Sequence, residues 1–199
     1  MASASHAQLF GPGKFKVEQT DDRFSTDGLA TYVGRNNRIS KKSVAGGLHI
    51  DGKGMFVEPL AIRRKSDGAL LSVGFYIHNE TEYDTAYGSP NKIGIPQRIT
   101  FLPNGGQPIS FAIENGGSKW GYLASYNTIS RSASAKIQES GFADLSVGQF
   151  KQIARATTLA VKIEGSERAV VYNERDIAKT FLANLRTFDA TTVSAAPRD

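Results

Sequence analysis

Apolar residues recur most regularly in the last quarter of the chain, between Leu145 and Phe188. Behind Ser146, whose side chain can cap a helix, four apolar positions recur at helical spacing: Val147, Phe150, Ile153 and Ala154. Two strand-like runs, residues 159–163 and 169–172, follow and are joined by a turn containing glycine. This part of the pattern predicts a short helix and then a β-hairpin.

A second stripe at helical spacing completes this C-terminal unit. We expect Asn173 to cap the second helix, with Asp176 three residues later. The stripe consists of Ile177, Phe181, Leu182, Leu185 and Phe188. Such an apolar face has to be covered by another layer of structure. The unit is therefore a helix, a β-hairpin and a helix that pack on a sheet formed by the rest of the chain.

The remainder of the chain alternates between apolar and polar residues in short runs separated by glycine and asparagine. The best strands are residues 55–62 and 69–78, joined by a charged turn that ends in Asp67-Gly68. Residues 130–140 are small and polar, and predict a last strand or a linker. Trp120 and Tyr126 lie at strand spacing, which favours places in the core or on a sheet face.

These elements predict an α+β fold. Its main layer is a twisted, mainly antiparallel β-sheet, arranged as a sandwich or a partly closed barrel, with the C-terminal helix–β-hairpin–helix unit against it. We divide the 199 residues into a flexible N-terminal tail (1–13), a single globular domain (14–189) and a flexible C-terminal tail (190–199).

The composition excludes several classes of chemistry. The chain has no cysteine, which rules out disulfides, thiolate zinc sites and cysteine nucleophiles. It has no run of eighteen apolar residues, so no segment is expected to span a bilayer as a helix. The stretch from Ala2 to Ala7 has the small-residue character of the end of a signal peptide. This predicts a periplasmic or secreted protein, with a cytoplasmic location as the alternative.

Two kinds of surface are candidates for binding a partner. Residues 83–96 break the strand pattern for fourteen positions, which predicts a long loop that presents Tyr83 and Tyr87. The net charge of +5 is concentrated in the first third of the chain. There it predicts basic hairpins that contain Arg35, Arg38, Lys41, Lys42, Arg63 and Arg64.

A third candidate is chemical. His78, Glu80 and, from a neighbouring strand, His49 are residue types that could form an acid–base or metal site. Residues two apart on a strand are separated by roughly 6.5–7 Å, so convergence needs residues from other strands. A solvated strand end is the alternative. We therefore assign no catalytic, cofactor-binding or metal-binding residue from the sequence.

Together these patterns favour a non-enzymatic, extracytoplasmic bacterial protein that binds a partner protein or a component of the cell envelope. The first alternative is a module that binds nucleic acid or another polyanion through the basic hairpins. The second is a hydrolase with a site near His49, His78 and Glu80. No cofactor is expected, and the number of subunits stays open.

Overall fold

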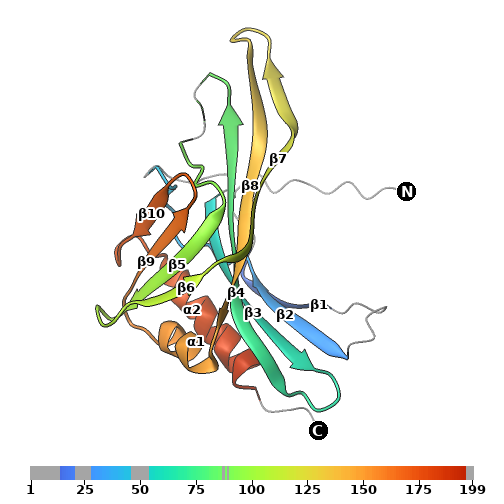
Figure 1. Cartoon of the computed structure of the whole chain (residues 1–199), viewed down its shortest axis with the longest axis vertical. Helices are drawn as coiled ribbons and strands as arrows, with labels where there is room; N and C mark the ends of the chain where they lie inside the picture. The colour runs from blue at the N-terminus through green and yellow to red at the C-terminus, as the bar shows by residue number, and fades with distance from the viewer. Residues whose placement is uncertain (1–13, 21–27, 46–53, 87, 89, 196–199) are drawn as a thin grey trace.

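The computed structural model describes residues 14–20, 28–45, 54–86, 88 and 90–195, and it contains two antiparallel sheets (Figure 1). The larger sheet has the strand order β1 (Lys16–Thr20), β2 (Leu29–Arg35), β3 (Gly54–Arg64), β4 (Leu70–Asp84), β8 (Ser132–Leu145) and β7 (Glu114–Asn127). The smaller has the order β10 (Ala169–Tyr172), β9 (Leu159–Gly165), β5 (Pro96–Pro103) and β6 (Ile109–Ala112). The predicted α+β fold with a mainly antiparallel sheet is confirmed.

The hydrophobic core lies where the two sheets and the helices meet. Alternate residues of β4 point into it, and Phe75 is a central member. Its ring lies 5.3 Å from the ring of Phe101 on β5 and 5.6 Å from that of Phe150 on α1 (Val147–Ala154). One buried side chain therefore joins both sheets to the first helix.

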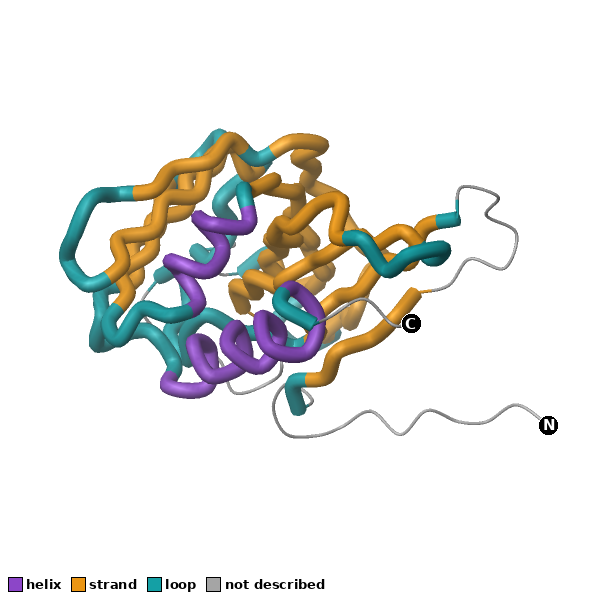
Figure 2. The backbone as a smooth tube through the Cα atoms, turned by 90° about the horizontal axis from the view of Figure 1, so that it is seen from below, coloured by secondary structure: helices purple, strands orange, loops and turns teal. Residues whose placement is uncertain are grey.

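Both helices gather on one side of the two sheets (Figure 2). The first, α1, contacts β4 of the large sheet and β5 of the small sheet. Ser146 begins it with a reciprocal capping box, in which Gln149 N–H donates to the Ser146 hydroxyl and the Ser146 N–H donates to the Gln149 side chain. This predicted cap is confirmed, as is the hairpin of β9 and β10 that follows.

The second helix, α2 (Lys179–Phe188), begins later than the sequence predicts. Asn173 does not cap it. Instead, Asn173 and Asp176 form a separate turn, in which the Asp176 N–H donates to the Asn173 carbonyl at 2.8 Å. The predicted apolar stripe is nevertheless correct, because its four helical members are buried and belong to the core: Phe181, Leu182, Leu185 and Phe188.

A π-helical segment, η1 (Asp189–Val193), continues directly from α2. Thr192 and Val193 are buried, and Val193 belongs to the core. Residues 190–193 are therefore part of the packed body rather than of the C-terminal tail that the sequence predicts. The predicted N-terminal tail, residues 1–13, lies outside the described residues. None of the described helices is long and apolar enough to cross a membrane.

Shortening Phe181 is expected to destabilise the fold strongly. Its side chain has no exposed surface, so Phe181→Ala leaves a cavity and should lower the free energy of unfolding by about 3–5 kcal/mol in urea titrations. The control is Val171→Ala on β10, where 54% of the side chain is exposed. The control should change stability by less than about 0.5 kcal/mol. A small effect of Phe181→Ala would contradict the packing of α2 described here.

Candidate functional site

A three-stranded arm projects from the body and is the most distinctive surface of the molecule (Figure 1). We define the arm as residues 81–84 at the end of β4 together with residues 120–137 of β7, β8 and their turn. None of its described residues belongs to the main cluster of core residues, although Ile137 at its base is fully buried. The arm therefore extends beyond the packing that stabilises the rest of the fold.

Among the side chains of the arm that the structure describes, three large apolar ones are exposed. Trp120 is 56% exposed, Tyr126 58% and Ile129, in the turn, 95%. Trp120 and Tyr126 therefore lie on β7 with more than half of their surface exposed to solvent, and not in the core. The sequence carries a partial signal for the exposure of Tyr126, because it lies opposite Ala133 in a segment of small residues, Ser132 to Ala135, that cannot cover a large aromatic ring.

The turn of the arm has a defined geometry. The Asn127 side-chain oxygen accepts hydrogen bonds from the backbone N–H groups of Ile129 and Ser130, at 2.9 and 3.2 Å. Arg131 has a φ of 51°, in the left-handed region that closes such turns. The exposure of Ile129 therefore follows from local hydrogen bonding, which directs its side chain away from the strands.

Tyr83 belongs to this arm and not to a loop, since β4 continues to Asp84. Its ring makes an edge contact with the ring of Trp120 at a centroid distance of 5.2 Å. The Nζ atom of Lys92 lies over the Trp120 ring, 5.9 Å from its centre. Lys92 is held in turn by Glu167, with its Nζ 2.6 Å from the carboxylate. Trp120 is thus supported at the base of the arm. Tyr87, the other predicted contact residue, lies outside the described residues.

The rest of the predicted loop is fixed to the body by Glu139 of β8. Its buried carboxylate accepts hydrogen bonds from the backbone N–H groups of Ile93 and Gly94, the latter at 2.6 Å, and from Asn79 Nδ2 at 2.9 Å. Ile93 itself is fully buried. This end of the loop is therefore a structural anchor, and the prediction that residues 83–96 form one exposed loop is wrong.

The first group of basic residues does not form a hairpin. The segment after β2 runs to the C-terminal unit, where Ala178 N–H donates to the Ile39 carbonyl at 2.9 Å. Arg35 contacts Glu18 and Glu58, Arg38 is buried with its guanidinium 5.4 Å from the centre of the Phe56 ring, and Lys42 pairs with Asp176. Lys41 is exposed. Most of these charges are thus engaged within the fold.

The second basic group does lie at a hairpin, the turn between β3 and β4. Arg64 is exposed and pairs with Asp67 at 2.8 Å. Arg63 is buried, and its guanidinium donates to backbone carbonyls of the C-terminal segment, including that of Thr192 at 2.9 Å from Nε. The two neighbouring arginines therefore face opposite ways, as alternate residues of a strand do.

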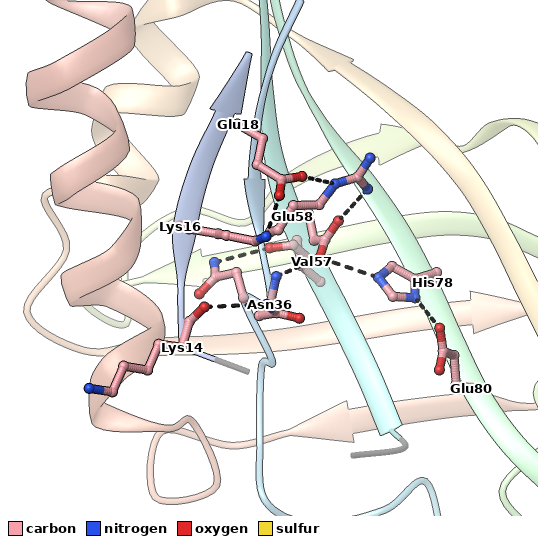
Figure 3. Close-up of polar contacts among 10 residues, drawn as sticks. Lys14, Lys16, Glu18, Asn36, Val57, Glu58, His78 and Glu80 are labelled. Carbon is pink, nitrogen blue, oxygen red and sulfur yellow. Dashed lines mark hydrogen bonds and ion pairs between the residues drawn. The ribbon is translucent and has the colours of Figure 1, made fainter. Parts of the chain in front are cut away.

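His78 and Glu80 lie on the outer face of the large sheet, together with Glu58 of β3 (Figure 3). The two nitrogens of the His78 ring each lie 3.6 Å from a carboxylate oxygen, Nε2 from Glu58 and Nδ1 from Glu80. The ring is stacked on Phe56 at a centroid distance of 4.7 Å. Glu58 also accepts a hydrogen bond from the Asn36 N–H at 2.7 Å. His49, the third predicted member, lies outside the described residues.

This arrangement favours a charged imidazole. Burial alone lowers the pKa of His78, but the contacts and charges of Glu58 and Glu80 outweigh burial, and the pKa is raised above its usual value. Burial raises the pKa of Glu58, yet His78, the Asn36 N–H and Arg35 together hold that pKa below its usual value. The pKa of Glu80 is lowered, chiefly by His78.

Such a cluster is better suited to holding strands together than to catalysis. A histidine that acts as a general base has to be neutral near the working pH, whereas His78 is stabilised in its charged form. Both ring nitrogens face carboxylates, so neither is directed at a hydroxyl nucleophile. Within the described residues, no three histidine or acidic side chains come together in a way that could hold a metal ion.

The cluster predicts a pH dependence of stability with a definite sign. Because the pKa of His78 is higher in the folded than in the unfolded chain, its stabilising contribution is complete below about pH 6.5 and is lost as the pH rises through the folded value. The difference in unfolding free energy between wild type and His78→Gln should therefore be larger at about pH 5.5 than at about pH 8.5. Urea titrations at both values measure it.

Glu80→Gln serves as a graded control, since His78 then keeps Glu58 but loses its other carboxylate. The pH-dependent difference should shrink in this background without vanishing. An NMR titration of the His78 ring gives an independent check. A difference that is constant with pH, or one that grows toward alkaline pH, would exclude this account of the cluster.

No protein family, curated protein or solved structure matches the chain in comparisons of its sequence and fold. No functional residue can therefore be carried over from a relative. The candidate surfaces rest on their geometry: an arm with exposed apolar side chains, and a polar cluster whose contacts lie within the sheet.

Proposed function

We propose that the protein is a non-enzymatic binding protein that engages a partner protein through the arm. One observation carries this proposal: Trp120, Tyr126 and Ile129 are exposed on a projection that extends beyond the main cluster of core residues. Burying apolar surface gains roughly 25 cal/mol per Å², and tryptophan and tyrosine dominate the energetics of protein interfaces. The arm supplies such anchors in solvent, where a partner can cover them.

The arrangement of the anchors supports a protein partner over a lipid surface. Trp120 and Tyr126 lie opposite Ile137 and Ala133, which are four positions apart on β8, so they are about 13 Å from each other along the strand. Asn127, Thr128 and Ser130 surround Ile129 with polar groups. A bilayer would have to accept these polar groups together with a single apolar tip, at a considerable cost. An interface between proteins combines apolar anchors with a polar rim in just this way.

The two alternatives have less support. A polyanion surface would need many basic side chains that face solvent together, whereas Arg35 and Lys42 are paired with carboxylates and Arg63 is buried. A hydrolase would need a reactive group beside His78, and both of its nitrogens face Glu58 and Glu80. The extracytoplasmic location remains part of the proposal, with the residues from Ala2 to Ala7 as its support.

Changing the three anchors should abolish partner binding and leave the fold intact. The variant is Trp120→Ala, Tyr126→Ser and Ile129→Ser combined. Its unfolding free energy should stay within roughly 1 kcal/mol of wild type, because none of the three side chains is buried. A photo-crosslinking residue at position 129 should capture a partner from an envelope extract of the source organism. The same probe should capture nothing when Trp120 and Tyr126 are changed.

A matched control removes exposed apolar side chains elsewhere. Leu71→Ser with Val171→Ser changes residues that are 47% and 54% exposed but lie outside the arm, and capture should persist. Equal loss in both variants would mean that general stickiness explains the binding. Crosslinks between copies of the chain, or a dimer in sedimentation that the arm variant abolishes, would contradict a different protein as partner. Binding to lipid vesicles alone would point to a membrane instead.

A further inference from the structure

A cavity of about 270 Å³ lies at the opposite end of the large sheet from the arm, where β1, β2 and β3 meet the segment after α2. Its described walls include the cations Arg63, Arg64 and Lys65 and the side chains of Tyr32 and Thr191. No described residue that lines it is acidic. The described lining of the cavity thus carries positive charge.

Arg63 gives this recess a buried charge. The residue is only 9% exposed, and its donors point to backbone carbonyls: Nη2 reaches those of Thr192 at 2.6 Å and Ala195 at 2.9 Å, and Nη1 reaches that of Gly68. All these acceptors are neutral. Among the described residues, no carboxylate lies within ion-pair distance of Arg63, in contrast to Arg35 and Arg64.

Carbonyls at the C-terminal end of a helix offset roughly half an elementary charge, so they compensate the Arg63 guanidinium only in part. A buried guanidinium is normally matched by a full negative charge as well. Here the charge lies at the wall of a recess open to small molecules. The electric field of Arg63 is reinforced by Arg64 and Lys65, which follow it in the chain. The field of Arg63 and its basic neighbours would therefore attract an anion in the recess.

We infer that this cavity binds a small oxyanion, a phosphate or sulfate group carried by a small molecule. Planar guanidinium groups match such groups in geometry and charge. The volume exceeds that of a single oxyanion and lies just below the usual range for small-molecule sites, roughly 300–1,000 Å³. The rest of the ligand would lie against Ala30 and the ring of Tyr32.

Arg64 can take part because its present ion pair is weak. It contacts Asp67, and both side chains are about half exposed. Exposed pairs of this kind contribute little, so Arg64 can exchange Asp67 for a ligand at small cost. Arg63 keeps its place through the C-terminal carbonyls and supplies charge to a site that is already formed.

The test measures binding of inorganic phosphate and of glycerol 3-phosphate to the full chain. Melting temperature is followed at constant ionic strength, with chloride replacing the anion, since a ligand that binds only the folded state raises it by mass action. Both anions should raise it in a saturable way. Amide NMR signals of Lys65 and residues 191–195 should shift, and those of the arm should not.

Arg64→Gln combined with Lys65→Gln should weaken the affinity at least about tenfold, because charge-assisted hydrogen bonds to the ligand are lost. Both residues are exposed, so the variant should fold, and its melting temperature without ligand verifies this. The control is Arg98→Gln with Lys162→Gln, which removes the same net charge from exposed positions on β5 and β9. The control should bind like wild type.

Three results would overturn the inference. The first is a melting temperature that does not saturate with either anion. The second is an equal loss of affinity in the two variants, which would reflect net charge alone. The third is binding of heparin without binding of phosphate or glycerol 3-phosphate, which would indicate a polymeric ligand. None of these results bears on the arm, whose residues lie elsewhere in the fold.

Discussion

The association of the two sheets depends on one buried carboxylate. Glu139 lies in the large sheet, and the backbone N–H groups that it binds belong to Ile93 and Gly94, in the connection that leads from β4 to the small sheet. A buried carboxylate without donors would cost several kcal/mol, so the chain has to bring donors to it. Through Ile93 the connection then enters the core and reaches the turn between β9 and β10, whose Glu167 N–H donates to the Ile93 carbonyl.

The close approach of these segments explains two of the glycines. Gly94 has a φ of 81°, and a Cβ there would lie 2.4 Å from the Ser166 hydroxyl. A Cβ on Gly165 would lie 2.3 Å from the carbonyl of Ile93. Side chains at either position would push the connection away from the small sheet. The Glu139 carboxylate and the two glycines therefore act together to hold the connection against the small sheet.

The same carboxylate marks where the body ends and the arm begins. Glu139 faces Asn79 across β4 and β8, two positions before the first residues of the arm. On one side of this pair the strands are covered by the small sheet and the helices, and on the other side they leave the core. The arm can thus project because its base is fixed by polar contacts at a defined register.

The sequence predicts the parts of this structure that local periodicity determines. The stripe of α2, the cap at Ser146 and the hairpin around Asp67-Gly68 all depend on residues close together in the chain. The structure differs from the predictions where contacts between distant segments determine the position of a residue. Arg63 lies in a charged run typical of a solvated turn, but it binds Thr192, 129 positions away.

The candidate site was harder to predict for a related reason. Alternation shows that Trp120 and Tyr126 lie in a strand, but it does not show whether another layer covers them. Tyr83 lies on a strand that continues farther than its mixed composition suggests, and not in the predicted loop. Glu139 carries no local signal, since its partners come from a segment that is 45 residues or more away.

β7 forms an edge of the large sheet, and its geometry affects whether copies of the protein aggregate at high concentration. Edge strands invite other strands to pair with them, and a flat edge next to apolar side chains is a template for fibres. The pairing of β7 with β8 is interrupted in three places, between Glu114 and Gly117, between Trp120 and Leu123, and between Leu123 and Ser125. Such irregularities twist and bend the strand, so neighbouring copies cannot align their backbones into a continuous cross-β stack. The arm can therefore expose the apolar side chains of Trp120, Tyr126 and Ile129 to solvent while the irregular edge of β7 opposes fibril formation.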